Sequence, residues 1–485
     1  MPGDLVLAVD QGTSATKCLL LDRSGRVVRS ASAPVGIGYP RPGWVEQRPE
    51  DVAGSVLAAT ATVLDGLAAG DLAGIGLSTQ RESALLWDRA TGRPVDALLG
   101  WQDQRAAGVC ERLRPYRNEI RRITGLPLDP MFSAAKLTWL LDRHDPDRRL
   151  SRAGRLAAGT VDSWLMFALT GQHVMEAGNA SRTQLLDLCT GQWNAELLQI
   201  FEVPEAVLPV IVSSEGKLGT VTAGPLAGGQ VRAVLGDSHA ALYAHGAGEK
   251  GVGDRAGSHS AAKVTYGTGS SVMRTAGRGT GDAAALGTEA VCRTIAWADP
   301  EPQVALEGNI RSSGATLTWL AELFGTTPEQ IVRLAGETGK SEGVHIVPAF
   351  GGLAAPWWDD SAQGLISGVS LGTRLPQLAR AAVESVALQV DAVVRSMPSA
   401  GAILADGGAS ASDLLMQLQA DISGVPVRRA RERDLSAVGA GLLAARARWG
   451  RVGPLSYDDF MPRQDRTALR EAWLNAVHQS RKVQR

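Results

Sequence analysis

Two apolar runs separated by a short polar turn open the chain. Residues 5–9 are all apolar and lead directly into Asp10, and a second apolar run covers residues 18–21. Runs of this length around a glycine-containing turn predict two buried strands. Gly12 allows the positive φ that such a turn often needs, and it lets a ligand approach the backbone closely.

Asp10, Thr13 and Ser14 give this turn one carboxylate and a short row of hydroxyl and backbone N–H donors. Such donors suit phosphate oxygens, and a carboxylate suits Mg²⁺ or its bound waters. The turn is therefore a candidate phosphate and magnesium site. Taken alone, the same residues fit a polar β-hairpin without a nucleotide equally well.

The rest of the first half predicts an α/β lobe. A third strand is expected over 26–31, and Pro49 with two following acids predicts the first turn of a helix that runs to about Ala69. The pattern then predicts a strand over 73–78, mostly helical structure over 101–193, and a short strand over 231–235 that leads to Asp237. Strands, helix and strand in this order indicate a mixed sheet.

The second half repeats the opening pattern. Residues 263–274 predict strand, glycine turn and strand, and a helix over 375–397 and a strand over 402–405 follow. A Gly-Gly turn at 407–408 opens another helix, where a ligand can lie at the positive end of the helix dipole, and a last helix is expected over 436–449. The repeat predicts two lobes, 1–246 and 247–485, and the Gly-rich residues 246–260 predict a mobile loop near their boundary.

Length and charge restrict the class of function. A chain of 485 residues favours two domains of roughly 200 to 250 residues each. With 49 basic and 50 acidic residues the net charge is −1, which favours neither nucleic acid nor an anionic membrane as partner. No apolar stretch approaches the ~18 residues that span a bilayer, and residues 1–4 lack the basic start of a signal peptide. Four widely spaced cysteines predict buried thiols in a reducing compartment, and hence a cytoplasmic protein.

Short motifs follow one another along roughly residues 5 to 445. In chain order they are Asp10-Gln-Gly-Thr13, Gly43-Trp-Val-Glu46, Thr79-Gln-Arg-Glu82, Trp101-Gln-Asp103, Gly125-Leu-Pro-Leu-Asp-Pro130, Asn179-Ala-Ser-Arg182, Thr265-Tyr-Gly-Thr-Gly269, Ala305-Leu-Glu-Gly308, Pro348-Ala-Phe-Gly-Gly-Leu-Ala-Ala-Pro356 and Asp406-Gly-Gly408. The series resembles the FGGY family of carbohydrate kinases and, within it, the glycerol kinases. The resemblance implies two ribonuclease H-like α/β lobes of the actin and hexokinase type, an interlobe cleft, and ATP and Mg²⁺ as cofactors.

The resemblance also implies roles for the strand-ending turns. Asp237 would accept the proton of the acceptor hydroxyl, and Asp10 would hold Mg²⁺, usually through water. The nucleotide would contact Thr13, Ser14, Lys17, Thr268, Gly269, Gly314, Thr318, Gly408 and Ser412. Lys17, Thr318 and Ser412 replace an arginine, a glutamine and an asparagine that are usual in glycerol kinases, so nucleotide recognition is expected to differ there. For Lys17, an edge-strand lysine without a ligand is an equal alternative.

Three residues would bind the acceptor by resemblance, and three others change its pocket. Arg81 and Glu82 would hold adjacent hydroxyls of a diol, and Trp101 would cover its carbon backbone. The departures from the glycerol kinase pattern are Met131 for tyrosine, Ser238 for glutamine and Ser271 for phenylalanine. The lost polar contacts and the lost ring predict a wider pocket that holds glycerol less tightly.

The expected reaction is ATP-dependent phosphorylation of a primary hydroxyl of a small polyol, with glycerol as first choice. A tetritol, a pentitol or a ketopentose is an alternative acceptor. A non-kinase, actin-like or chaperone-like ATP-binding switch and a non-catalytic binding protein are alternatives of other classes. His239, two residues after Asp237, is a further candidate for the site. We expect the lobes to close on the substrate and, by analogy, dimers or tetramers.

Overall fold

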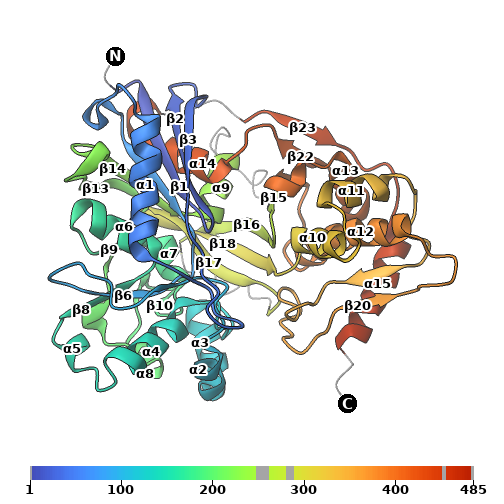
Figure 1. Cartoon of the computed structure of the whole chain (residues 1–485), viewed down its shortest axis with the longest axis horizontal. Helices are drawn as coiled ribbons and strands as arrows, with labels where there is room; N and C mark the ends of the chain where they lie inside the picture. The colour runs from blue at the N-terminus through green and yellow to red at the C-terminus, as the bar shows by residue number, and fades with distance from the viewer. Residues whose placement is uncertain (1–2, 247–260, 280–288, 451–454, 482–485) are drawn as a thin grey trace.

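The structure is a computed structural model that describes residues 3–246, 261–279, 289–450 and 455–481. Two large mixed sheets, one of six and one of seven strands, form the centres of two α/β lobes (Figure 1). The two-lobed α/β fold predicted from the sequence is confirmed. The loop expected over 246–260 lies, apart from its first residue, outside the described residues.

The first sheet has the strand order β13-β14-β5-β1-β2-β3. The apolar runs around the opening turn form an antiparallel pair, and β5 and β14 follow parallel to β1 in the sheet. The strands are β1 (Leu5–Gln11), β2 (Ala15–Asp22), β3 (Val27–Pro34), β5 (Ile75–Thr79), β13 (Glu215–Thr220) and β14 (Gln230–Gly236). The carboxyl ends of the parallel strands β1, β5 and β14 therefore lie side by side, which brings Asp10 and Asp237 to one edge of the sheet.

The second sheet repeats this arrangement in the order β17-β18-β16-β15-β21-β22-β23. Its antiparallel part begins with β15 and β16, and β21 and β22 continue parallel to β15. The strands are β15 (Ala261–Tyr266), β16 (Ser270–Arg278), β17 (Cys292–Asp299), β18 (Glu301–Ile310), β21 (Ala402–Asp406), β22 (Val427–Ala430) and β23 (Tyr457–Phe460). The recurrence of one strand-turn-strand unit, predicted from the sequence, is confirmed.

The helices of the first half lie around the first sheet and in a smaller subdomain below it (Figure 1). They are α1 (Pro49–Val63), α2 (Ala107–Arg112), α3 (Arg117–Thr124), α4 (Ser133–His144), α5 (Arg149–Arg152), α6 (Val161–Thr170), α7 (Ala177–Ser181), α8 (Ala195–Ile200) and α9 (Asp237–Gly246). The prediction that the first helix reaches Ala69 was wrong, because Gly66 takes a positive φ of 75° soon after the helix ends. The short strands here are β4 (Glu46–Gln47), β6 (Leu85–Asp88), β7 (Leu98–Leu99), β8 (Leu156–Gly159), β9 (Val174–Glu176), β10 (Leu186–Asp187), β11 (Gln192–Trp193) and β12 (Val210–Val212).

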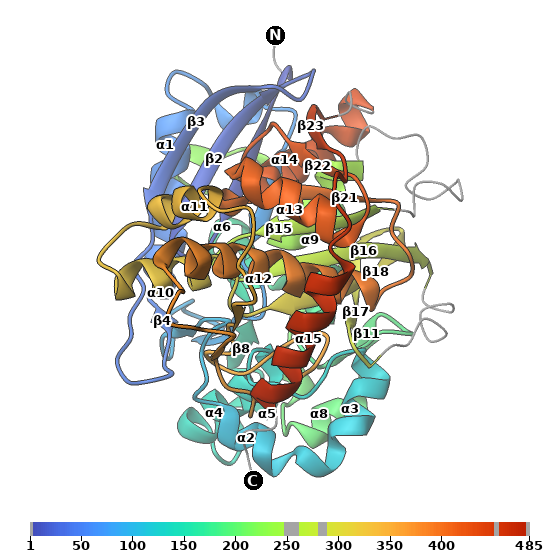
Figure 2. The same cartoon turned by 90° about the vertical axis from the view of Figure 1, so that its right-hand side faces the viewer.

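Helices of the second half cover the outer face of the second sheet (Figure 2). They are α10 (Gly314–Leu323), α11 (Pro328–Gly336), α12 (Leu375–Arg395), α13 (Asp413–Ser423) and α15 (Thr467–Arg481), with a small sheet of β19 (His345–Val347) and β20 (Leu365–Ser367). One helix departs from this arrangement. Helix α14 (Leu435–Trp449) crosses back and packs against β1, β5 and α9 (Figure 1).

A shared core joins the two lobes. Apolar residues of β1, α9 and α14 form one cluster with Met273, Ala296 and Ala305 from the second sheet. Gly439 makes the crossing of α14 possible, since a Cβ there would lie 1.9 Å from the Ala240 carbonyl oxygen. This shared core fixes the two sheets relative to each other, so that the turns after β1 and β15 face the same space between the lobes.

Among the described residues, no helix has both the length and the apolar character that crossing a bilayer requires. The four cysteines form no disulfide. Cys18 and Cys292 are buried as predicted and Cys110 is half-buried, but Cys189 is exposed, so the prediction of burial was wrong there.

Candidate active site

A cavity of about 340 Å³ lies between the lobes, and both lobes line it. From the predicted site residues, the first lobe contributes Thr13, Arg81, Glu82, Trp101, Met131, Asp237 and Ser238, and the second contributes Thr268, Gly269 and Ser271. The remaining predicted residues, Asp10, Ser14, Lys17, Gly314, Thr318, Gly408 and Ser412, do not line this cavity. The residues assigned to the acceptor thus lie together, next to the turn assigned to phosphate.

Of the carboxylates that line the cavity, Asp237 is the most exposed. It directly follows β14 and begins α9, and 41% of its side chain is exposed. Its Oδ1 accepts hydrogen bonds from the Ser238 backbone N–H at 2.6 Å and from Arg81 Nε at 3.0 Å. A carboxylate held at one oxygen, at the positive end of a helix, is well placed to receive a proton at the other.

Asp10 lies beside it at the end of β1, directly opposite Ser78 of β5 in the sheet. Ser78 Oγ donates to Asp10 Oδ1 at 2.7 Å. Burial raises the pKa of Asp10 to about 7; the Ser78 hydrogen bond opposes this and the neighbouring Asp237 carboxylate adds to it. Because burial disfavours the charged carboxylate, a cation next to Asp10 would stabilise its ionised form.

The donor set around Asp10 fits Mg²⁺ that is completed by a nucleotide. Among the described residues, no group of three or more histidine, cysteine, aspartate or glutamate side chains forms a metal site. Mg²⁺ commonly uses one or two carboxylates and takes its other ligands from water and substrate phosphates. Asp10 with Asp237 near it agrees with that mode of binding and not with a metal site built from protein ligands alone.

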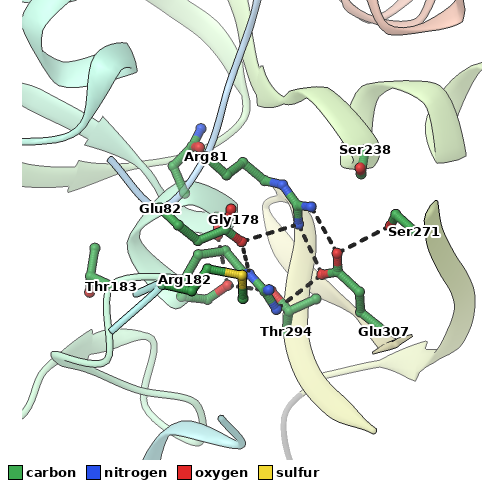
Figure 3. A network of polar contacts seen from close by, with 12 residues as sticks. Arg81, Glu82, Gly178, Arg182, Thr183, Ser238, Ser271, Thr294 and Glu307 are labelled. Carbon is green, nitrogen blue, oxygen red and sulfur yellow. Dashed lines mark hydrogen bonds and ion pairs between the residues drawn. The ribbon is translucent and has the colours of Figure 1, made fainter. Parts of the chain in front are cut away.

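Arg81 and Glu82 line the cavity, but their charged groups already have protein partners (Figure 3). Arg81 Nη1 and Nη2 donate to the two carboxylate oxygens of Glu307 at 2.9 and 2.8 Å. Glu82 Oε1 accepts from Arg182 Nε at 2.7 Å, and Arg182 Nη1 lies 3.0 Å from Glu307 Oε2. Arg81, Glu82, Arg182 and Glu307 therefore form a buried network of two cations and two anions that spans both lobes.

His239 belongs to this network and does not line the cavity. Its side chain is fully buried, and its Nε2 lies 3.3 Å from Arg81 Nη1. Burial and the Arg81 charge lower the pKa of His239 well below its usual value. The neutral ring then accepts the Arg81 hydrogen bond at Nε2 and carries its proton on Nδ1.

The opening turn and Trp101 form one wall of the cavity. Trp101 Nε1 donates to Thr13 Oγ1 at 3.1 Å, so the indole is held across the turn.

Ser14 is exposed. Lys17 pairs with Asp434 at 2.5 Å, which connects β2 to the residue before α14. The structure thus gives Lys17 a protein partner.

The second turn, at 267–269, packs on the first turn of α10. The Gly314 N–H donates to the Gly267 carbonyl at 3.0 Å, and a Cβ on Gly314 would lie 2.6 Å from that oxygen. A Cβ on Gly269 would lie 2.5 Å from the Ile310 carbonyl oxygen. Both glycines allow backbone to pack on backbone, while Thr318 lies exposed one turn further along α10.

The third turn, after β21, presents an open backbone. Gly407 takes a φ of 89°, and a Cβ on it would meet the Tyr266 backbone. A Cβ on Gly408 would meet nothing within 4 Å, so a flat ligand has access there. Ser412 caps α13, and its Oγ accepts from the Leu415 N–H at 3.2 Å.

Met131, Ser238 and Ser271, the three departures in the acceptor pocket, all line the cavity. Ser271 Oγ donates to Glu307 Oε1 at 3.2 Å, so its hydroxyl is bonded to protein. Serine is smaller than the phenylalanine of the glycerol kinase pattern, so no ring occupies this part of the cavity wall.

Sequence reasoning assigned no role to several residues that the structure brings to the cavity. Asp129, Asn309, Arg311, Ala354 and Trp358 line it, and Arg311 Nη2 donates to Asp129 Oδ2 at 2.8 Å across the lobes. Glu307 and Arg182 also had no assigned role. The signal was present, since most of these residues lie in or beside the motifs at 125–130, 179–182, 305–308 and 348–356.

Comparison with known families agrees with this geometry. The model of the FGGY family of carbohydrate kinases, N-terminal domain, matches residues 5–240, and the C-terminal domain model of the same family matches residues 262–448. The chain belongs to the FGGY family of carbohydrate kinases. A glycerol kinase of Aromatoleum aromaticum is 40% identical over 98% of each chain, and one of Alkalilimnicola ehrlichii is 41% identical over 91% of this chain and 90% of its own.

Solved structures agree on the fold. The crystal structure of Plasmodium falciparum glycerol kinase with ADP matches with a TM-score of 0.84 and 25% identity over 99% of each chain. A gluconate kinase from Lactobacillus acidophilus matches with a TM-score of 0.83 at 22% identity, covering 98% of this chain and 96% of its own. The resemblance to FGGY kinases that the sequence motifs predicted is confirmed. Because family members act on different acceptors, the fold by itself leaves the acceptor open.

Proposed function

We propose that this kinase transfers the terminal phosphoryl group of ATP to a primary hydroxyl of a small polyol, with glycerol as the first choice. Relatives named glycerol kinase at about 40% identity over nearly the whole chain support this choice. One observation carries the mechanism. The partly exposed carboxylate of Asp237 lies in an interlobe cavity, held at one oxygen by Arg81, next to the turn at 267–269.

In this mechanism the acceptor lies between Trp101 and the Arg81–Glu82 pair. Its hydroxyl donates to the Asp237 oxygen that Arg81 does not hold, and the proton passes to that oxygen as the phosphoryl group is transferred. Positioning and exclusion of water supply most of the rate, so we expect the lobes to close around the acceptor.

The nucleotide would lie mainly along the second lobe. Thr13, Ser14, Thr268 and Gly269 would bind its phosphates, and the ring and ribose would lie near Gly314, Thr318, Gly408 and Ser412. When bound, Mg²⁺ would neutralise charge on the transferring phosphoryl group, with Asp10 holding it through water. Of these residues, Lys17 is the weakest candidate for the phosphates, because it already pairs with Asp434.

The acceptor pocket favours testing larger polyols beside glycerol. Met131, Ser238 and Ser271 are smaller or less polar than the residues usual in glycerol kinases, and all three line the cavity. A tetritol, a pentitol or a ketopentose is therefore retained as an alternative acceptor. The domain division at 246, the oligomeric state and the cytoplasmic location stay predictions.

The test measures ADP formation from MgATP with glycerol, erythritol, xylitol, ribitol and xylulose in turn. Acceptor-dependent turnover is expected, with Asp237→Asn lowering kcat by about 100-fold to 10,000-fold because the proton acceptor is lost. Asp51→Asn is the matched control, since Asp51 is also an aspartate in the first turn of a helix but lies exposed on α1. Turnover that Asp237→Asn leaves intact would remove the mechanism, and ADP formation independent of any acceptor would favour a non-kinase switch.

A further inference from the structure

Glu307 is a buried carboxylate on the second lobe whose strongest contacts are with the first lobe. It lies in β18, between β16 and β17, opposite Met273 and Cys292 in the sheet. Its side chain is fully buried, and among the described residues both of its ion-pair partners come from the first lobe: Arg81 at 2.8 and 2.9 Å and Arg182 at 3.0 Å. Burial alone would raise its pKa, but Arg182 and Arg81 hold the pKa of the Glu307 carboxyl well below its usual range. Glu307 is therefore a fixed anion on a rigid strand.

Besides Glu307, Arg81 contacts His239 Nε2 at 3.3 Å and Asp237 Oδ1 at 3.0 Å. It follows β5 in a loop, and its long side chain passes over Gly236, where a Cβ would lie 2.5 Å from Arg81 Cδ. An unrestrained arginine has many rotamers, and a fork of two parallel hydrogen bonds to a carboxylate selects one of them. Glu307 supplies that fork (Figure 3).

The distribution of hydrogen bonds around Arg81 decides how Asp237 is held. Both terminal nitrogens of the guanidinium are bonded to Glu307, and only Nε reaches Asp237, at Oδ1. Nη2 keeps a second N–H, so it is the position in which Glu307 holds the guanidinium that limits the contact with Asp237 to Nε; without Glu307, Arg81 could shift and bind both oxygens of Asp237 through Nε and Nη2. The oxygen needed to accept the acceptor proton would then be blocked.

We propose that Glu307 is a positioning residue of the kinase reaction. It fixes Arg81 so that Arg81 holds Asp237 by one oxygen only and leaves the other for the acceptor hydroxyl. The inference rests on the proposed function, because it assumes that Asp237 accepts the proton. Ser271 contributes to the same arrangement through its hydrogen bond to Glu307 Oε1.

The experiment compares Glu307→Gln with the unsubstituted protein in steady-state kinetics with the best acceptor. Since misplacing a reacting group by about 1 Å costs on the order of 100-fold, we expect kcat to fall about 100-fold. The KM for ATP should stay within about twofold, because Glu307 makes no contact predicted for the nucleotide. Glu384→Gln is the matched control: Glu384 is also buried and paired with an arginine, Arg380 at 2.8 Å, but within α12 and away from the cavity.

A double-mutant cycle separates positioning from a general structural effect. If Glu307 acts through Asp237, then Glu307→Gln should change the residual kcat of Asp237→Asn by less than about threefold. The proposal would be contradicted if Glu307→Gln lowered kcat by the same factor with Asp237 intact and with Asp237→Asn. It would also be contradicted if the Glu307→Gln variant had the same kcat as the Glu384→Gln control. If Glu307→Gln does not fold, Glu307→Asp takes its place: it keeps the charge, retracts it by one methylene, and should lose about tenfold in kcat with the same dependence on Asp237.

The two possible failures are distinguishable. Failure of the proposed function would appear as no acceptor-dependent turnover by the unsubstituted protein. Failure of the inference alone would appear as turnover by the unsubstituted protein that survives Glu307→Gln.

Discussion

The raised pKa of Asp10 predicts that binding of the magnesium nucleotide is coupled to the release of a proton. The burial of Asp10 raises the pKa from 3.8 to about 7, with the Asp237 carboxylate adding to the shift. A cation beside Asp10 favours the ionised form, so binding must expel a proton wherever the carboxyl still carries one. The perturbation that tests this is Asp10→Asn, which keeps the shape of the side chain but has no proton to lose.

The size of the effect follows from the pKa. With a pKa of about 7, Asp10 is about nine-tenths protonated at pH 6 and about one-tenth protonated at pH 8. If the bound state is fully ionised, binding releases about 0.9 proton at pH 6 and about 0.1 proton at pH 8. Asp10→Asn should remove most of the release at pH 6 and change little at pH 8.

Titration calorimetry measures this release directly. MgADP binding is measured at pH 6 and pH 8 in two buffers with different ionisation enthalpies, with Mg²⁺ in excess so that the nucleotide is already complexed. The difference in apparent enthalpy gives the number of protons released. Equal proton release by the unsubstituted protein and by Asp10→Asn at pH 6 would refute the assignment.

The same shift has a consequence for stability. The pKa of Asp10 is higher in the folded state than in the unfolded state, so the folded state binds the proton more tightly. The free energy of unfolding therefore falls as the pH rises from about 4 to about 7 and Asp10 ionises. Without ligand, Asp10→Asn should therefore raise the melting temperature at pH 8 and have less effect at pH 5. A variant that lowers the melting temperature at pH 8 would contradict this sign.

Three other predictions follow from contacts in the structure. Gly439→Ala should lower the stability by about 1 to 3 kcal/mol in a denaturant titration, because its Cβ would lie 1.9 Å from the Ala240 carbonyl oxygen; an unchanged midpoint would mean that α14 does not pack as described. Ser271→Phe should shift kcat/KM toward glycerol over pentitols by about tenfold, because the ring narrows the cavity; an unchanged preference would exclude Ser271 from acceptor selection. Trp101→Phe should raise the acceptor KM by about fivefold, because the bond to Thr13 that orients the ring is lost; a change confined to the KM for ATP would contradict that role.

Much of the site could be predicted from the sequence because its parts are local. Asp10 lies near the end of β1, Asp237 directly follows β14, and glycine turns follow β1 and β15. The pattern predicted these strand ends and turns, and the role of Asp237 came from the resemblance to FGGY kinases. In the structure the parallel strands β1, β5 and β14 end at one edge of the sheet, which is why Asp10 and Asp237, 227 positions apart, are neighbours.

The partners of the charged residues could not be predicted in this way. Arg81 binds Glu307, 226 residues later in the chain, and Lys17 binds Asp434, 417 residues later. Such pairs depend on how the two lobes pack, which periodicity and spacing do not encode. Helix α14 is a similar case: its apolar pattern predicts a buried helix, but not that it lies on the first sheet.

A crystal structure with a non-hydrolysable ATP analogue, Mg²⁺ and the best acceptor tests the central claim most directly. We expect the acceptor's primary hydroxyl oxygen within about 2.6 to 3.2 Å of Asp237 Oδ2, in line with the terminal phosphate of the analogue, with Arg81 still bonded to Oδ1. A hydroxyl bound away from Asp237, or a terminal phosphate on a different surface from the acceptor, would contradict the account.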